Sequence, residues 1–185
     1  MANFTEKLIV TTFTSMLERT PLDKITVTAL INEANISRNT FYYHYEDIYD
    51  LLDQVMLGVL EKYENAAKDM DLPEVFKSFL YACKANRKKV YNIFNSISRD
   101  RLERYVFQGT NSAIMFHLMK MAQELNVKEE RAKAVADIVR YSIYGFFTEF
   151  LWEGMKGDIE KKVDELWGLY GELLDCMFSD HRQKA

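Results

Sequence analysis

The chain has 185 residues, of which 48% are hydrophobic and 28% charged, and its formal net charge is −4. This composition is typical of a folded globular protein and excludes a disordered chain. No apolar run reaches 18 residues, and the N-terminus lacks the basic and apolar segments of an export signal, so we expect a cytoplasmic protein without a membrane span. Helix-breaking residues are scarce, with two prolines and seven glycines, and apolar and polar residues do not alternate as in a strand. Both observations predict an all-α fold.

The first predicted helix carries apolar residues at helical spacing and precedes a loop at residues 20–22; these residues are Phe4, Leu8, Ile9, Phe13, Met16 and Leu17. Residues 26–45 then read TVTALINEANISRNTFYYHY, two short helices around a tight turn. Asn35 tolerates the left-handed conformation that a sharp turn needs, and Ser37 is a suitable N-cap. The second helix, 38–45, buries Phe41 and directs hydrogen-bonding side chains elsewhere. This arrangement is how proteins enter the DNA major groove.

The second short helix carries a recognisable pattern, S-R-x-T-F-Y-Y-H-Y, at residues 37–45. It resembles the helix-turn-helix of TetR-family transcriptional regulators, which are bacterial and cytoplasmic. The resemblance implies a three-helix DNA-binding head at 1–50, a linking helix at about 47–70, and a helical effector-binding and dimerisation domain at 71–185. About nine helices are expected in all.

The DNA contacts expected from this resemblance and from side-chain chemistry involve nine residues. Thr26 and Thr28 begin the first short helix, where backbone amides and a hydroxyl can hold a phosphate. Arg38 and Asn39 can hydrogen-bond guanine and adenine edges. The others are Ser37, Thr40, Tyr42, Tyr43 and His44. The tyrosines are also compatible with packing inside a helical domain, an interpretation that applies most to Tyr45.

One feature departs from the family pattern. Residues 1–50 carry four basic and seven acidic side chains, although phosphate binding favours a basic surface. Family members often have lysines near positions 46 and 48, where this chain has Glu46 and Ile48. This predicts weaker, more salt-sensitive binding, or binding that needs a dimer or a partner. A less favoured alternative is a head that has lost DNA contact.

The remainder of the chain continues as amphipathic helices. We expect helices at 74–85 and 87–98 after a break at Pro73, and a kink or boundary at Gln108-Gly109-Thr110. Two apolar stripes, at about 128–155 and 158–178, are predicted to form a homodimer interface, although both could simply close the monomer's own core. Residues 75–175, including YSIYGFFTEFLWEGMKG at 141–157, resemble the C-terminal domain of low-GC Gram-positive regulators related to DhaS.

Other candidate chemistry is limited. Residues 77–104 contain eight basic and two acidic side chains. This excess of positive charge predicts a solvated helical face; alternatively, it predicts a binding site for an anionic effector, an acidic partner or DNA. The candidate walls of an effector pocket are Phe94, Phe116, His117, Tyr144, Phe147 and Trp152. We expect no catalytic residues, no metal site and no cofactor, because no suitable spacing of ligands or nucleophiles occurs.

The expected function is that of a sequence-specific DNA-binding transcriptional regulator. We expect a homodimer on a palindromic operator, acting as a repressor that a small-molecule effector releases. The alternative is a TetR-like co-regulator that acts through a protein partner and binds DNA weakly or not at all. An enzyme built on the helical body is a third, more distant interpretation.

Overall fold

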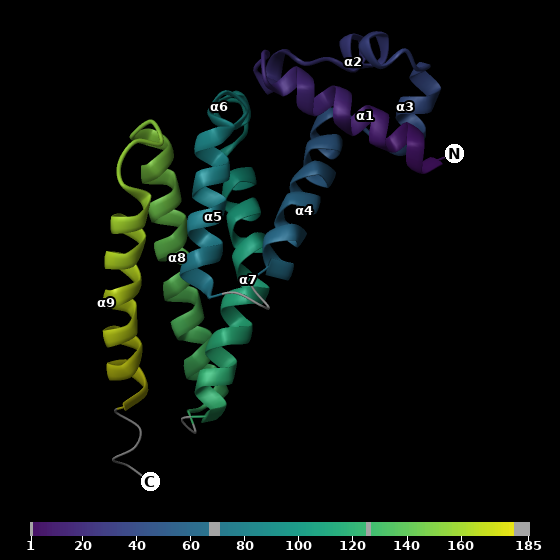
Figure 1. Cartoon of the computed structure of the whole chain (residues 1–185). Coiled ribbons are helices and arrows are strands. Elements are labelled where there is room, and N and C mark those ends of the chain that lie inside the picture. The colour runs from purple at the N-terminus through teal and green to yellow at the C-terminus, as the bar shows by residue number, and fades with distance from the viewer. Residues whose placement is uncertain (1, 67–70, 125–126, 180–185) are drawn as a thin grey trace. The chain divides into compact units, whose positions relative to one another are not determined.

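The computed structural model describes the backbone of residues 2–66, 71–124 and 127–179. It describes their side chains as well, except those at 2–3, 110–114, 116, 121 and 173–179. Within these residues all regular secondary structure is helical, as the sequence predicts (Figure 1). The elements are α1 (Ala2–Leu17), the 3-10 helix η1 (Leu22–Lys24), α2 (Val27–Ala34), α3 (Arg38–His44), α4 (Ile48–Ala66), α5 (Leu72–Ala85), α6 (Arg87–Phe94), α7 (Arg99–Glu124), α8 (Glu129–Trp152) and α9 (Ile159–Ser179).

The chain divides into two compact units, and each consists of two segments. Residues 1–60 and 85–105 form the first unit, whereas residues 61–84 and 106–185 form the second. The first unit therefore contains α1 to α3, most of α4, all of α6 and the first turns of α7. None of the helices among the described residues is long and apolar enough to cross a membrane.

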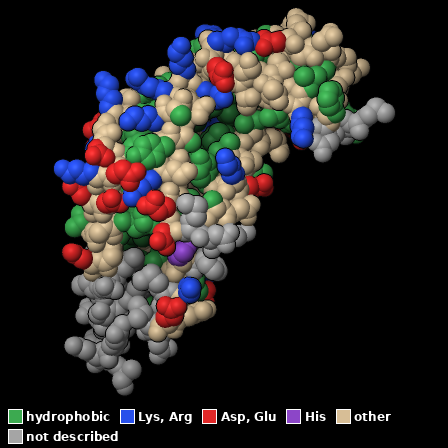
Figure 2. Space-filling view, in the orientation of Figure 1, with side chains coloured by type: hydrophobic (Ala, Val, Ile, Leu, Met, Phe, Trp, Pro, Cys, Tyr) green, Lys and Arg blue, Asp and Glu red, His purple; other side chains and the backbone are tan. Residues whose placement is uncertain are grey.

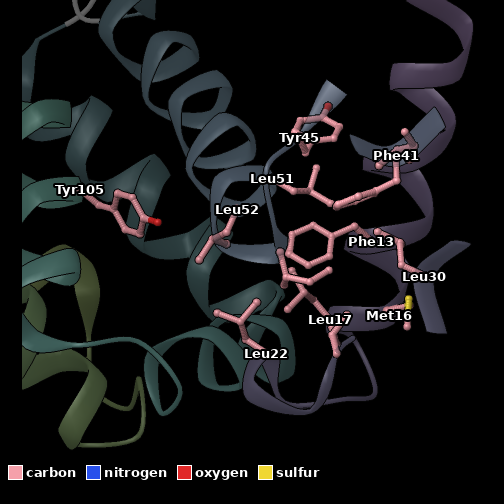
Figure 3. Close-up of a cluster of buried hydrophobic side chains, with 13 residues drawn as sticks. Phe13, Met16, Leu17, Leu22, Leu30, Phe41, Tyr45, Leu51, Leu52 and Tyr105 are labelled. Carbon is pink, nitrogen blue, oxygen red and sulfur yellow. The ribbon is translucent and has the colours of Figure 1, made fainter. Parts of the chain in front are cut away.

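The core of the first unit is built around the short helices that the sequence singles out. Phe13, Leu30, Phe41, Leu51 and Leu52 are fully buried and lie in one cluster (Figure 3). Each comes from an amphipathic helix whose apolar positions recur every three or four residues, so one face of each helix is removed from water. Phe4, which the sequence pattern places on the apolar face of α1, is instead exposed.

The second unit is a helical bundle of α5, the later part of α7, α8 and α9. Its core contains buried side chains of α7, α8 and α9 (Leu118, Val135, Ala136, Val139, Ile143 and Tyr170). From α5, Phe76 packs against this core, and its ring centroid lies 5.6 Å from that of Trp167 on α9. Gly154, Met155 and Gly157 take positive φ angles between α8 and α9, where the chain reverses.

Two expectations about the helices are wrong. The predicted helix boundary at residues 108–110 is absent, because α7 runs unbroken from Arg99 to Glu124. A single glycine inside a long helix costs only about 1 kcal/mol relative to alanine, which neighbouring turns offset. The interpretation of residues 77–104 as a continuous solvated face also fails at Lys77, which is buried.

Lys77 is enclosed by carboxylates from two helices. Its Nζ lies 2.8 Å from Glu74 on α5, and 3.0 and 2.7 Å from Glu160 and Asp164 on α9. These hydrogen bonds, led by the one to Asp164, raise the pKa of Lys77. The Tyr81 hydroxyl donates a further hydrogen bond to Glu160 at 2.9 Å. A buried ammonium with three partners ties α5 to α9.

Candidate nucleic-acid interface

The start of α2 is capped by Thr26, a role that the sequence analysis did not assign to this residue. Thr26 has an extended backbone, and its Oγ1 accepts a hydrogen bond from the backbone amide of Ala29 at 3.1 Å. Thr26 and Thr28 are both exposed. The N-terminus of α2 thus faces solvent with its hydroxyl-bearing side chains, at the end of the helix where the partial charge is positive.

The turn between α2 and α3 is made by Asn35, whose φ of 51° and ψ of 47° lie in the left-handed region. Its amide donates to the carbonyls of Ile31 and Asn32, and the amide of Ile36 donates to Ile31 at 3.0 Å. Ser37 then caps α3, because its Oγ accepts a hydrogen bond from the Thr40 amide at 3.0 Å. The predicted turn and cap are both confirmed.

The seven residues of α3 sort cleanly into a buried and an exposed face. Phe41 is fully buried, whereas Arg38 and Asn39 are exposed. Tyr42 and Tyr43 are 50% and 80% exposed, far above what a packing aromatic shows. Thr40 and His44 are half-buried. The short helix therefore presents arginine, asparagine and tyrosine side chains to solvent.

Tyr45 belongs to the core. It is buried beside Phe41, with ring centroids 5.8 Å apart (Figure 3). Its hydroxyl has no hydrogen-bond partner among the described residues. Burial, followed by the negative charges of Glu6 and Asp50, raises the pKa of Tyr45 to about 12. Tyr45 therefore does not join the exposed side chains of α3.

Some of the charged side chains around these helices form ion pairs with each other. Arg19 pairs with Glu33 of α2, and Lys24 with Asp23 at 3.3 Å. At the start of α4, the Asp47 carboxylate accepts hydrogen bonds from the amides of Tyr49 and Asp50, at 2.7 and 2.8 Å. Asp47 thus stabilises the N-terminus of α4 and occupies amides that a phosphate would otherwise use.

The structure adds a feature that local sequence patterns did not predict, namely the docking of α6 and the start of α7 on the helix-turn-helix unit. Asn92 donates to the carbonyl of Leu17 at 2.8 Å, and Ser96 to Asp23 at 3.2 Å. Lys89 pairs with Glu18 at 3.1 Å. The only sequence signal was the excess of basic residues, which gave no hint of these partners.

The start of α7 is attached to α4 by a polar cluster around Asp53. Arg101 donates to both Asp53 oxygens at 2.9 Å and to the carbonyl of Tyr49 at 3.2 Å. The buried Tyr105 hydroxyl also donates to Asp53. Burial, and then this hydrogen bond, raises the pKa of Tyr105. The cluster holds α4 in place within the first unit.

The expected pocket residues are distributed over both units, and their role in a pocket stays a prediction. Phe94 lies in the first unit and the others in the second. Phe147 is buried against Phe79, with ring centroids 5.3 Å apart, and Tyr144 lies 5.8 Å from Phe107. His117 is half-buried and Trp152 is 72% exposed. The side chain of Phe116 lies outside the described residues.

Comparisons with known proteins agree on one type of protein. A TetR family model described as a transcriptional regulator C-terminal region matches residues 70–169. The fold is similar to that of the dihydroxyacetone kinase operon activator DhaS, with a TM-score of 0.55, 18% identity, and coverage of 93% of this chain and 97% of that one. A proposed fatty acid metabolism regulator of Clostridium perfringens gives a TM-score of 0.53 and 14% identity at the same coverage. No curated protein matches the chain.

Proposed function

Because the chain belongs to the TetR family of transcriptional regulators, we propose that it binds a palindromic DNA operator through α3 of two identical subunits. The observation that carries this proposal is the orientation of α3. Phe41 holds one face of the helix in the core, so Arg38, Asn39 and Tyr43 are left free to meet a duplex.

The proposed contacts divide by chemistry. Arg38 and Asn39 donate hydrogen bonds to base edges in the major groove, which gives sequence specificity. Thr26, Thr28, Tyr42, Tyr43 and His44 contact phosphates and fix the register of the helix, with Ser37 and Thr40 at its start. The Arg38 guanidinium lies 5.9 Å from the Tyr42 ring, so these two side chains support each other at the surface.

A homodimer through α8 and α9 is part of the proposal. On α8, the exposed residues Ile138, Tyr141, Gly145 and Trp152 recur at spacings of three, four and seven, which places them on one face. On α9, Leu169 is exposed between Gly168 and Gly171. A Cβ added at any of these three glycines would meet nothing within 4 Å. Such apolar, small-residue surfaces suit the close approach of a second subunit.

The regulatory outcome is proposed as repression that a small-molecule effector releases. The two heads of the dimer can adopt different spacings in different conformations. An effector that binds one of these conformations more tightly raises its population and thereby changes the affinity for the operator. The second unit, with its aromatic contacts among Phe76, Phe79, Phe146 and Phe147, is the proposed effector-binding part. The same mechanism would give activation of transcription in place of repression if the bound regulator promoted transcription.

A second candidate function is supported by the charge of the head. Residues 1–50 have three more acidic than basic side chains, and Asp47 occupies the first amides of α4. A co-regulator that acts through a protein partner would tolerate this charge, whereas a DNA-binding protein must overcome it.

Selection of bound fragments from random double-stranded DNA tests the proposed function. The purified protein is expected to enrich a palindrome, and a Tyr42→Ala/His44→Ala variant is expected to enrich nothing. Recovery of no common sequence at low salt would contradict DNA binding and favour the co-regulator.

A further inference from the structure

The unit that contains the helix-turn-helix is electrically neutral only because of residues 85–105. Residues 1–60 carry eight acidic and four basic side chains, whereas residues 85–105 carry two acidic and six basic ones. Docking of α6 and the start of α7 therefore changes the formal charge of this unit from −4 to zero. Since DNA affinity depends on cations that neutralise phosphates, the docked segment provides most of the cations available.

Some of these cations are already used inside the unit. Lys89 pairs with Glu18, and Arg101 with Asp53. Four others are exposed and take part in none of the ion pairs found among the described residues. We call them the α6 basic surface: Arg87, Lys88, Arg99 and Arg104. Figure 2 shows several Lys and Arg side chains around the position that α6 has in Figure 1.

The position of this surface on the unit is fixed by hydrogen bonds. Asn92 holds the middle of α6 against the end of α1, and Ser96 holds its end against Asp23. Asp23 precedes Thr26, the cap of α2, by three residues, and Arg99 follows Ser96 by three. Residues 92–96, which lie between the two pairs of cations in the sequence, are therefore attached to the segment that leads into α2, the helix whose start is proposed to hold a phosphate.

The surroundings favour phosphates over an acidic protein as the partner. None of the exposed large hydrophobic side chains of the described residues lies in 85–105. The centre of a protein–protein interface is usually apolar or aromatic, whereas a phosphate backbone requires only cations.

We infer that the α6 basic surface contacts the phosphate backbone of the same duplex that α3 binds, outside the base pairs that α3 contacts. This inference rests on the proposed DNA binding and extends it to a segment that lies beyond the helix-turn-helix in the sequence. Contacts of this kind are independent of base sequence, so they raise the salt dependence of binding and leave the preferred sequence unchanged.

The test compares the native protein with an Arg87→Gln/Lys88→Gln/Arg99→Gln/Arg104→Gln variant. Each is titrated with a duplex of about 40 base pairs that carries the selected palindrome at its centre, over a range of KCl concentrations. We expect the variant to bind more weakly at low salt. The slope of log affinity against log salt should become shallower by about 0.9 for every phosphate that the variant no longer neutralises.

Two control variants isolate the effect of position. Glutamine at the exposed Lys120, Lys128, Lys156 and Lys161 removes the same charge from the second unit and should leave the slope native. Lysine at Arg87, Arg99 and Arg104 keeps the charge and should restore native binding. Circular dichroism melting establishes that each variant is folded.

The outcomes separate this inference from the proposed function. A native slope in the glutamine variant, or an equal fall in the second-unit control, would overturn the role of the α6 basic surface while leaving DNA binding by α3 intact. A native protein that binds no duplex would contradict the proposed function itself, and with it this inference.

Discussion

Single residues of α3 divide between packing in the core and the proposed DNA recognition. Phe41 is fully buried in the core of its unit, whereas Tyr43, two positions later, is 80% exposed. Because successive helical residues point in different directions, a seven-residue helix can fill a core with one side chain and present its neighbours to a ligand. This separation allows stability and DNA binding to be changed independently.

We predict opposite effects for alanine at these two positions. Phe41→Ala should lower the free energy of unfolding by about 3–5 kcal/mol, because it leaves a cavity in a packed core. Tyr43→Ala should change that free energy by less than about 0.5 kcal/mol, since it removes an exposed ring. Urea denaturation measures the stabilities, and DNA titration should show that Tyr43→Ala nevertheless weakens binding. Equal stabilities for the two variants would contradict this assignment.

Tyr45 offers a second test, because its buried hydroxyl has no partner among the described residues. Tyr45→Phe should leave stability unchanged or raise it by up to about 1 kcal/mol at neutral pH. The pKa of Tyr45 is raised to about 12, so the native protein should lose stability as pH rises from the ordinary tyrosine value of 10 towards 12. Urea denaturation at several pH values should show a smaller loss in the variant, and parallel curves would exclude this effect.

Whole elements depend on contacts that no local pattern reveals. The helix-turn-helix was predictable because its signals are close together: Thr26 and Ser37 cap the helices that follow them, and Asn35 makes the turn between. The docking of α6 was not predictable, since Asn92 and its acceptor Leu17 are 75 residues apart. Burial of Lys77 had the same cause, because Glu160 and Asp164 lie on the last helix. The unbroken α7 shows that Gly109 was a weak breaker signal.

The contact between α5 and α9 has a predicted pH dependence. Hydrogen bonds from Lys77, and then from Tyr81, lower the pKa of Glu160. A carboxylate with a lowered pKa stabilises the fold above its ordinary value of about 4.5, and this stabilisation is lost as pH falls through its folded pKa. Lys77→Gln should therefore lower the melting temperature at pH 7. The difference in melting temperature between this variant and the native protein should become smaller below about pH 4.5.

A matched control is available on α8, where Lys133 pairs with Glu129 at the surface. Lys133→Gln should leave the melting temperature nearly unchanged, because exposed ion pairs contribute little. Calorimetry across this pH range measures both variants. A difference for Lys77→Gln that stays constant down to pH 3 would rule out the role of the carboxylates around it.

At the scale of the whole molecule, the proposed function requires two subunits. Tyr141 and Trp152 on α8 are 59% and 72% exposed, which is unusual for large apolar side chains unless a partner covers them. A duplex with two half-sites binds a dimer more tightly than two separate heads, because the second contact becomes intramolecular. The oligomeric state and the operator affinity should therefore change together.

We predict that Tyr141→Glu/Trp152→Glu produces a folded monomer whose affinity for the palindrome falls by roughly tenfold or more. Leu57→Glu, at an apolar residue of α4 in the first unit that is 44% exposed, introduces a charge on a different helix and should leave the dimer intact. Sedimentation velocity measures the oligomeric state, and circular dichroism measures the helix content. A dimeric double variant would exclude this face of α8 as the interface.

The division of the first unit between two stretches of chain has a practical consequence for any attempt to isolate the head. A fragment ending at residue 60 would retain α1 to α3 yet lack Ile93 of α6, Ile97 of the following connection and Tyr105 of α7, which pack in its core. The apolar surface exposed by this truncation would favour aggregation. The recognition helix therefore cannot be transplanted as a portable N-terminal module, and a swap between relatives must include both stretches.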